Sequence, residues 1–231
     1  MQKINEEKID GELLIEQLNE LIQKNSNLMN NSIYQKIDCR KLVFQFLISE
    51  IQNYLLIIIL SKSLQKKSWF SENGLKSDNI NDECLKIINS SFTNSNKDKF
   101  FISSFVQFEY FFRLVAIEFN CENRNIGTTV KNLLSSLQID LKIYDLWKIF
   151  SHIRNCMHNG GFHNNPDEII KYKNIEYLFV KGNAITYSSV KNIIYFIEEI
   201  IDNLIIPIIE KSQNKDLIQH TYTKLTFEYT E

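Results

Sequence analysis

The chain has 231 residues, of which 44% are hydrophobic, so it can form a substantial buried core and does not have the composition of a disordered chain. Its formal net charge of -2 gives no overall basic field, which argues against strong nonspecific binding to DNA. Six glycines and two prolines are few for this length, which favours long helices over a turn-rich β fold.

The cysteines and the apolar segments indicate the cellular compartment in which we expect the protein. The four cysteines are far apart and none forms a CxxC pair, so neither a zinc site nor a redox motif is indicated. The longest apolar run, Tyr54–Leu60, is too short to cross a bilayer, and the first residues lack the hydrophobic segment of a signal peptide. We therefore expect a soluble, cytoplasmic protein with free cysteines, no cofactor, no metal and no membrane contact.

The first third of the chain reads as helices joined by polar connectors. Apolar residues recur at helical spacing over residues 8–24. Residues 32–65 form a long apolar segment, which predicts a helix in the middle of a bundle, because a helix that is apolar on most sides must be buried. Residues 67–79 are expected to form a polar connector, residues 81–90 a shorter helix, and residues 93–99 a second polar loop.

The strongest predicted helix covers residues 100–120, with Asp98 as its expected N-cap. Large apolar residues recur there at steps of three and four, so they should share a buried face against the residue 42–60 helix or the last helix. These residues are Phe101, Phe105, Phe108, Phe112 and Val115. Glu109 and Arg113 are four residues apart, which places them on one face and predicts an ordinary helix-surface ion pair.

Capping residues predict the next two helices. Thr128 or Thr129 is expected to cap a short helix that ends near Leu137. Asp140 is expected to cap a longer helix over residues 141–158.

Beyond that helix the pattern changes to a small hairpin and a last long helix. Residues 175–180 have the composition of a strand, and residues 181–183 read as a turn that leads to a second short strand. Ser188 or Ser189 is expected to cap the final helix, which Pro207 should kink or end. The last twelve residues alternate in polarity, so they read as a strand or as a disordered tail.

The segment Ser151–Asn165 gathers most of the chemistry of the chain, including three of the four histidines. Arg154 and His158 are four residues apart and point to the same side of a helix. Arginine offers a planar fork for phosphate oxygens, and histidine transfers protons near neutral pH. The pair suits metal-free RNA cleavage, in which a 2′-hydroxyl attacks the adjacent phosphate and the arginine stabilises the developing charge. Asn155 can orient the phosphate or the imidazole.

Other interpretations of this segment remain open at this stage. An arginine and a histidine followed by Asn-Gly-Gly also describe a helix C-terminus that is simply well capped. A metal site built from His152, His158 and His163 has Cys156 as its only nearby thiolate and no nearby carboxylate. Nothing in the sequence marks Cys156 as an activated nucleophile.

The stretch Ile153–Gly161, "IRNCMHNGG", resembles the signature of the HEPN-like superfamily, whose motif is an arginine, often followed by asparagine, and then a histidine. The upstream stretch Ser103–Ala116 also resembles an earlier helix of these families. The resemblance implies a helical bundle that is commonly dimeric, with two motif-bearing helices forming one composite site. Many members are metal-independent ribonucleases that act as toxins or in defence against phage.

By this resemblance, Arg154 and His158 would be catalytic with Asn155, while Glu109 and Asn159 would have supporting roles. Three residues separate Arg154 from His158, fewer than in the best-characterised ribonucleases of the superfamily. Other members are noncatalytic interaction modules. Two functions are therefore expected in competition, an endoribonuclease and a scaffold of a defence or toxin–antitoxin system.

The expected fold class is mostly α, a HEPN-like helical bundle with a small β-hairpin before the last long helix. The whole chain is expected to form one domain, with N-terminal helices over residues 1–97, a HEPN-like core over residues 98–212 and a tail over residues 213–231. The expected partners are RNA, a second copy of the chain in a homodimer, and an antitoxin or partner protein, without DNA.

Overall fold

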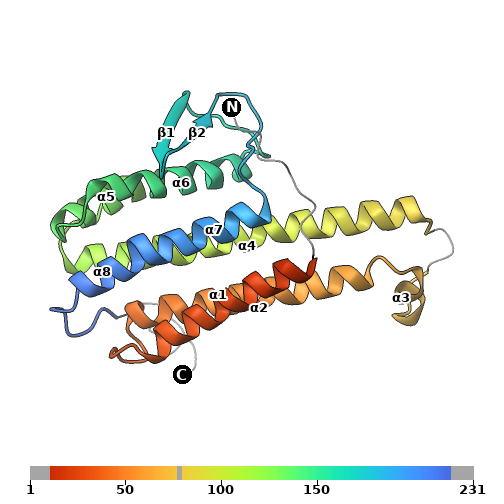
Figure 1. Ribbon diagram of the computed structural model, residues 1–231, viewed down its shortest axis with the longest axis horizontal. Helices are drawn as coiled ribbons and strands as arrows, with labels where there is room; N and C mark the ends of the chain where they lie inside the picture. The colour runs from red at the N-terminus through yellow and green to blue at the C-terminus, as the bar shows by residue number, and fades with distance from the viewer. Residues whose placement is uncertain (1–10, 77–79, 220–231) are drawn as a thin grey trace, which may run out of the picture.

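The computed structural model describes residues 11–76 and 80–219 and is a bundle of helices with one antiparallel hairpin against its side (Figure 1). The expected fold class, mostly α with a small hairpin, is confirmed. The alternating tail beyond Gln219 lies outside the described residues. In chain order the elements are α1 (Gly11–Asn30), α2 (Cys39–Ser63), α3 (Lys67–Glu72), α4 (Asp82–Glu118), α5 (Ile126–Ser136), a 3-10 turn (Leu141–Ile143), α6 (Tyr144–His158), β1 (Glu168–Tyr172), β2 (Ile175–Phe179), α7 (Val190–Ile200), a π-helical stretch (Ile201–Ile205) and α8 (Ile206–Lys211).

The longest helix, α4, runs unbroken for 37 residues, so the expected loop at residues 93–99 and its cap at Asp98 are wrong. The N-cap is Asn81. Polar side chains that suggested a loop bond instead to backbone carbonyls one turn earlier, as Thr93 does to Asn89 and Asn96 does to Phe92. Because α2 packs along α4, tertiary contacts stabilise a helix through weak helix formers (Figure 1).

The core is aromatic where α4 meets α6. The expected face of α4 is buried, as predicted, and its ring contacts are mainly with α6. Phe105 stacks on Trp147 with ring centroids 4.8 Å apart, and Phe101 lies 4.6 Å from Phe150. Phe150 also contacts Phe196 of α7, so one aromatic cluster fixes the position of α6 between two other helices.

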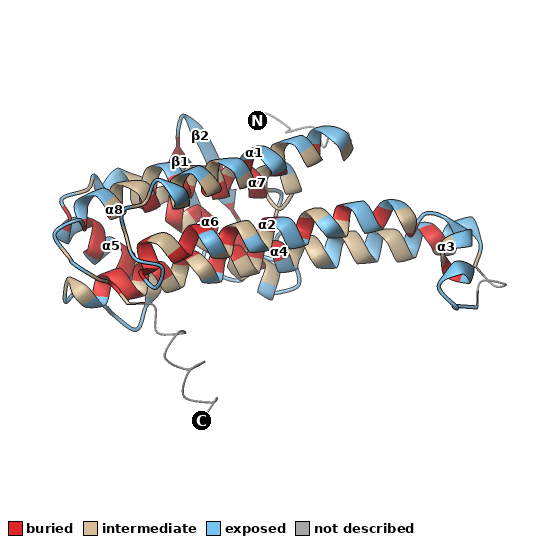
Figure 2. Ribbon diagram, turned by 90° about the horizontal axis from the view of Figure 1, so that it is seen from below, coloured by how far each residue is buried: buried red, intermediate tan, exposed pale blue. Residues whose placement is uncertain are grey.

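The outer half of α2 is less covered than expected. Leu56, Ile59 and Leu60 are 63%, 50% and 38% exposed, so the predicted position in the middle of the bundle does not hold for this part of the helix. Beyond the stacked rings of Tyr54 and Phe100, the ends of α2 and α4 project from the body and carry α3, which lies in the expected polar connector (Figures 1 and 2). We call residues 55–76 and 80–99 the arm. By length and composition alone, α2 and α4 are each long and apolar enough to cross a membrane.

Of the other three expected helix caps, two are confirmed and one is wrong. Asp140 caps the 3-10 turn before α6, and Ser189 caps α7. The cap of α5 is Asn125, whose side chain accepts a hydrogen bond from the backbone of Thr128 at 3.2 Å. The Thr129 hydroxyl donates instead to the backbone oxygen of Asn123 at 2.8 Å, which ties the loop before α5 to its first turn.

The hairpin uses a different partner strand from the one expected. β2 lies where the strand composition predicts it, but it pairs with the preceding β1, so the expected pairing with the residues after Lys181–Asn183 is wrong. Lys173 and Asn174 form the turn with φ of 47° and 63°, the left-handed geometry that matches the twist of a two-residue hairpin. Neither position is a glycine, so the turn is only weakly indicated by the sequence.

The last helix passes through Pro207 and ends at Lys211. Proline has no backbone N–H, so the carbonyl four residues earlier cannot receive its usual hydrogen bond. The π-helical stretch Ile201–Ile205 lies directly before it, a local widening that such an interruption accommodates. Pro207 therefore does not end the helix, and the helical pitch changes just before the proline instead.

Replacing Ser189 by alanine is expected to lower the free energy of unfolding by about 1 kcal/mol, because the first turn of α7 loses its side-chain cap. Ser188→Ala is the matched control, since Ser188 precedes the cap and should change stability by less than about 0.5 kcal/mol. Urea denaturation of both variants measures the difference. Equal losses in the two variants would show that the cap contributes nothing specific.

Candidate functional site

The dense segment identified in the sequence lies along α6 and divides between two flanks of that helix. With about 3.6 residues per turn, Arg154 and His158 lie on one side of the buried face and His152 lies on the other. Asn155 and Lys148, seven residues apart, lie close together on the outer side between them. The first flank borders α4, and the second lies under the hairpin. The segment therefore forms two separate groups of side chains.

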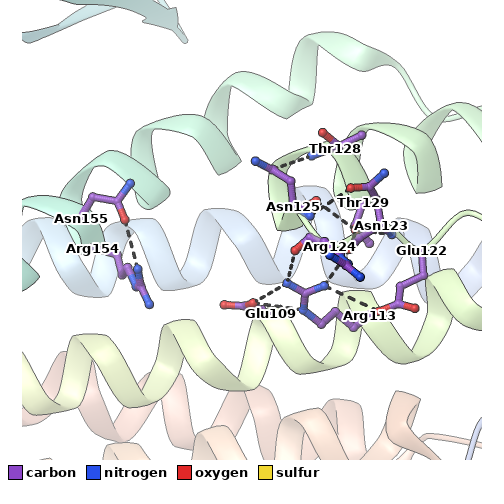
Figure 3. Close-up of polar contacts among 10 residues, drawn as sticks. All are labelled: Glu109, Arg113, Glu122, Asn123, Arg124, Asn125, Thr128, Thr129, Arg154 and Asn155. Atoms are coloured by element: carbon purple, nitrogen blue, oxygen red, sulfur yellow. Dashed lines mark hydrogen bonds and ion pairs between the residues drawn. The ribbon is translucent and has the colours of Figure 1, made fainter. Parts of the chain in front are cut away.

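Arg154 reaches from α6 toward α4 and is half-buried there (Figure 3). Its guanidinium lies over the ring of Phe105, 5.5 Å from the centroid, and its Nη1 donates to Oδ1 of Asn155 at 3.2 Å. Its Nε is buried without a hydrogen-bond partner. Within the described residues no carboxylate lies at ion-pair distance from it. The result is a positive charge held in place by an aromatic ring and an amide, with donors left for an anion.

Glu109, expected to support the motif, bonds instead to Arg113 on its own helix (Figure 3). Its Oε1 accepts from Nη2 and Nε of Arg113 at 2.9 and 3.1 Å, so the predicted ion pair is confirmed. Arg113 also lies 3.7 Å from Glu122. Two carboxylates balance this arginine, whereas Arg154 has no such partner in the described part of the chain.

His158 and Asn159 lie at the exposed end of α6. The backbone N–H of Gly161 bonds to the carbonyl of Cys156 at 2.8 Å, and Gly160 and Gly161 have φ of 67° and 92°, so the Gly-Gly pair ends the helix as expected. Among the described contacts the His158 ring makes no hydrogen bond. It is therefore free to turn toward a molecule bound at Arg154, one turn away.

The opposite flank of α6 is tied to the hairpin through Glu168. Both Lys148 and His152 bond to the Glu168 carboxylate, with His152 Nε2 at 2.8 Å from Oε2. The His152 ring stacks on Phe179 with centroids 4.6 Å apart, and its Nδ1 is buried without a partner. No local sequence pattern indicates this group, because Glu168 is 16 residues from His152 and 20 residues from Lys148.

His163 completes this second group beneath the hairpin. It is buried, its Nε2 lies 3.1 Å from the Pro166 oxygen, and its Nδ1 lies 3.7 Å from Cys156 Sγ. The His163 and His152 rings are 5.1 Å apart, whereas His158 is on the other flank, so the three histidines do not converge. No three histidine, cysteine or acidic side chains within residues 11–76 and 80–219 are placed to hold a metal ion. Burial raises the pKa of the Cys156 thiol, which disfavours the thiolate.

The stability of the protein is expected to fall as the pH drops below about 6.5 and His152 is protonated. Burial lowers the pKa of His152 from its ordinary 6.5 and outweighs the opposing effect of Glu168. The unfolded chain therefore binds a proton at a higher pH than the folded one. Neutral His152 contributes its full stabilisation above pH 6.5, and this contribution is lost as the pH falls toward the lowered pKa of His152 in the folded protein.

His152→Phe keeps the stack on Phe179 and should flatten this part of the stability curve. Thermal unfolding between pH 7.5 and 5, compared with wild type, measures the effect. An unchanged slope in the variant would assign the titration to another group.

The segment that resembles the HEPN-like signature thus forms the end of α6, with its arginine half-buried and its histidine exposed. Its Arg154–Asn155 pair and its glycine-terminated helix end are both present in the structure. Comparisons of the chain with models of protein families, with curated proteins and with solved structures gave no match.

Proposed function

We propose that the protein is a metal-independent endoribonuclease of a HEPN-like toxin or phage-defence type, with Arg154 and His158 as its catalytic residues. The observation that carries the proposal is the half-buried Arg154 guanidinium, which is positioned by Phe105 and Asn155 and has no carboxylate partner in the described residues. A fixed cation with free donors is suited to a phosphodiester oxygen. The resemblance of Ile153–Gly161 to the HEPN-like signature supports the same assignment.

In this proposal Arg154 binds the non-bridging oxygens of the scissile phosphate. A general base removes the 2′-hydroxyl proton, the 2′-oxygen attacks phosphorus, and the bond to the 5′-oxygen breaks after that oxygen receives a proton. The products are a 2′,3′-cyclic phosphate and a 5′-hydroxyl. Two proton transfers are needed, and two copies of α6 facing one another would supply one His158 as the base and the other as the acid. The composite site is therefore a homodimer site.

The proposal is tested by incubating the purified full-length protein with RNA in the presence of EDTA. Cleavage should persist with the chelator and leave 2′,3′-cyclic phosphate ends, and light scattering should give the mass of a dimer. Expression in bacteria should arrest growth. Intact RNA under all conditions tested, from a dimeric and nontoxic protein, would contradict the enzyme assignment.

The second candidate function is a noncatalytic interaction module. It is favoured by His158, which is exposed and has no described group to orient its ring, whereas a catalytic histidine usually has one. Val106 and Ile117 of the neighbouring α4 are about half exposed and offer apolar contact to a partner protein. Under this function, alanine at Arg154 or His158 would weaken a protein complex, with no RNA cleavage to lose.

A further inference from the structure

The arm has an apolar outer face on α2. Leu56, Ile59 and Leu60 follow steps of three and one, so they lie together on the side opposite the buried Tyr54 and Ile58. No charged residue occurs from residue 51 to residue 61. A continuous apolar face on a projecting element normally marks a contact with another molecule or with a membrane.

The end of the arm next to this face is basic. Lys62, Lys66, Lys67 and Lys76 are exposed, and within the described residues none of them lies at ion-pair distance from a carboxylate. Glu72 is the only acidic residue between positions 61 and 76. The acidic pair that follows, Asp82 and Glu83, lies in the first turn of α4, where the helix dipole stabilises negative charge.

An aromatic and an aliphatic side chain accompany the lysines. Trp69 of α3 is half-buried against Phe70 with ring centroids 5.3 Å apart, and Leu75 is mostly exposed. Tryptophan favours the boundary between apolar and aqueous phases, because its ring is apolar and its N–H is polar. Leucine and isoleucine on one side, with lysine and tryptophan at the end, form the combination that binds at a lipid headgroup boundary.

We propose that the arm binds the surface of an anionic lipid bilayer, with Leu56, Ile59 and Leu60 at the acyl boundary and the lysines against the headgroups. This inference is independent of the ribonuclease proposal and replaces the expectation of no membrane contact. RNA would use the lysines and gain little from the aliphatic face. A second copy of α2 packed on this face would cover the aliphatic residues and would leave the lysines and Trp69 at the end of the arm unexplained.

The test uses full-length Trp147→Phe protein, in which Trp69 is the remaining tryptophan. With vesicles of one part phosphatidylglycerol and two parts phosphatidylcholine, the protein should cosediment and its fluorescence should shift to the blue. Pure phosphatidylcholine vesicles should bind it weakly. Lys66→Glu and Lys67→Glu should each weaken binding at least about fivefold, and Leu56→Ser with Ile59→Ser should weaken it further.

The controls are Lys191→Glu on α7 and Ile169→Ser on the hairpin, both exposed and away from the arm. They should bind vesicles like the parent protein, and circular dichroism should show that every variant is folded. Absence of binding to the anionic vesicles overturns the proposal. Binding that survives the Leu56 and Ile59 changes points to charge alone, and self-association that these changes abolish points to a second copy. Either outcome also overturns it.

Discussion

Alanine at His158 or at Arg154 is expected to reduce RNA cleavage by about 10²–10⁴-fold, with the fold intact, because each side chain acts on the transition state. His158 is exposed and Arg154 makes only one side-chain hydrogen bond, so neither change removes a large part of the core. Single-turnover rates with saturating RNA measure the loss in the chemical step, and thermal unfolding checks the fold.

Two further variants separate chemistry from charge. Arg154→Lys keeps the positive charge but loses the planar fork, so cleavage should remain well below wild type. Arg124→Ala is the matched control, because Arg124 is an exposed arginine on the loop before α5 and should leave the rate unchanged. Equal losses in Arg124→Ala and Arg154→Ala would mean that the arginines act through general charge, and the assignment of a site to α6 would fail.

Local sequence patterns predicted helix caps and buried faces correctly where the pattern involves residues that are close along the chain. Asp140 and Ser189 cap the helices that they precede, and the aromatic spacing of α4 gave its buried face. The rules failed at residues 93–99, where composition indicates a loop but the packing of α2 along α4 favours continuation of the helix. Propensity is a weak preference, and tertiary contact overrides it.

The candidate site, too, was predictable where it depends on local spacing and unpredictable where it depends on packing. Spacing alone put Arg154 and His158 on one side of a helix, and the structure agrees. Spacing could not show that Phe105, 49 positions earlier, lies under the guanidinium, or that Glu168 draws Lys148 and His152 to the opposite flank. These contacts depend on how α4, α6 and the hairpin pack, which no local pattern records.

Replacing Arg40 by alanine is expected to lower the free energy of unfolding by about 3–5 kcal/mol, because it leaves the buried carboxylate of Asp38 without its counterion. Both side chains are fully buried. Arg40 donates to both carboxylate oxygens of Asp38, at 2.9 and 2.6 Å, and its Nη1 donates to the Ser212 carbonyl at 2.6 Å. Its guanidinium also lies 3.7 Å from the ring centroid of Tyr34.

The pair joins the start of α2 to the chain that follows α8. Asp38 Oδ2 accepts from the backbone of Ile218 at 3.2 Å, and Arg40 Nη2 donates to the carbonyl of Lys215 at 2.9 Å. Losing Arg40 should therefore release residues 212–219 first. Hydrogen exchange should accelerate at the Cys39 and Ile218 amides, because the Cys39 N–H bonds to the Ile218 carbonyl at 2.8 Å.

The double change of Asp38→Asn with Arg40→Met separates the cost of a stranded charge from the loss of the contacts themselves. Removing both charges should cost less than Arg40→Ala alone, because no unpaired ion then remains in the core. Lys41→Ala, one residue along α2, is the control and should change stability by less than about 0.5 kcal/mol. Denaturant unfolding measures all three. If Arg40→Ala lowered the free energy of unfolding no more than Lys41→Ala, the Asp38 carboxylate would have to be solvated in the absence of Arg40. The Asp38–Arg40 pair would then not be the interaction that fastens residues 212–219 to α2.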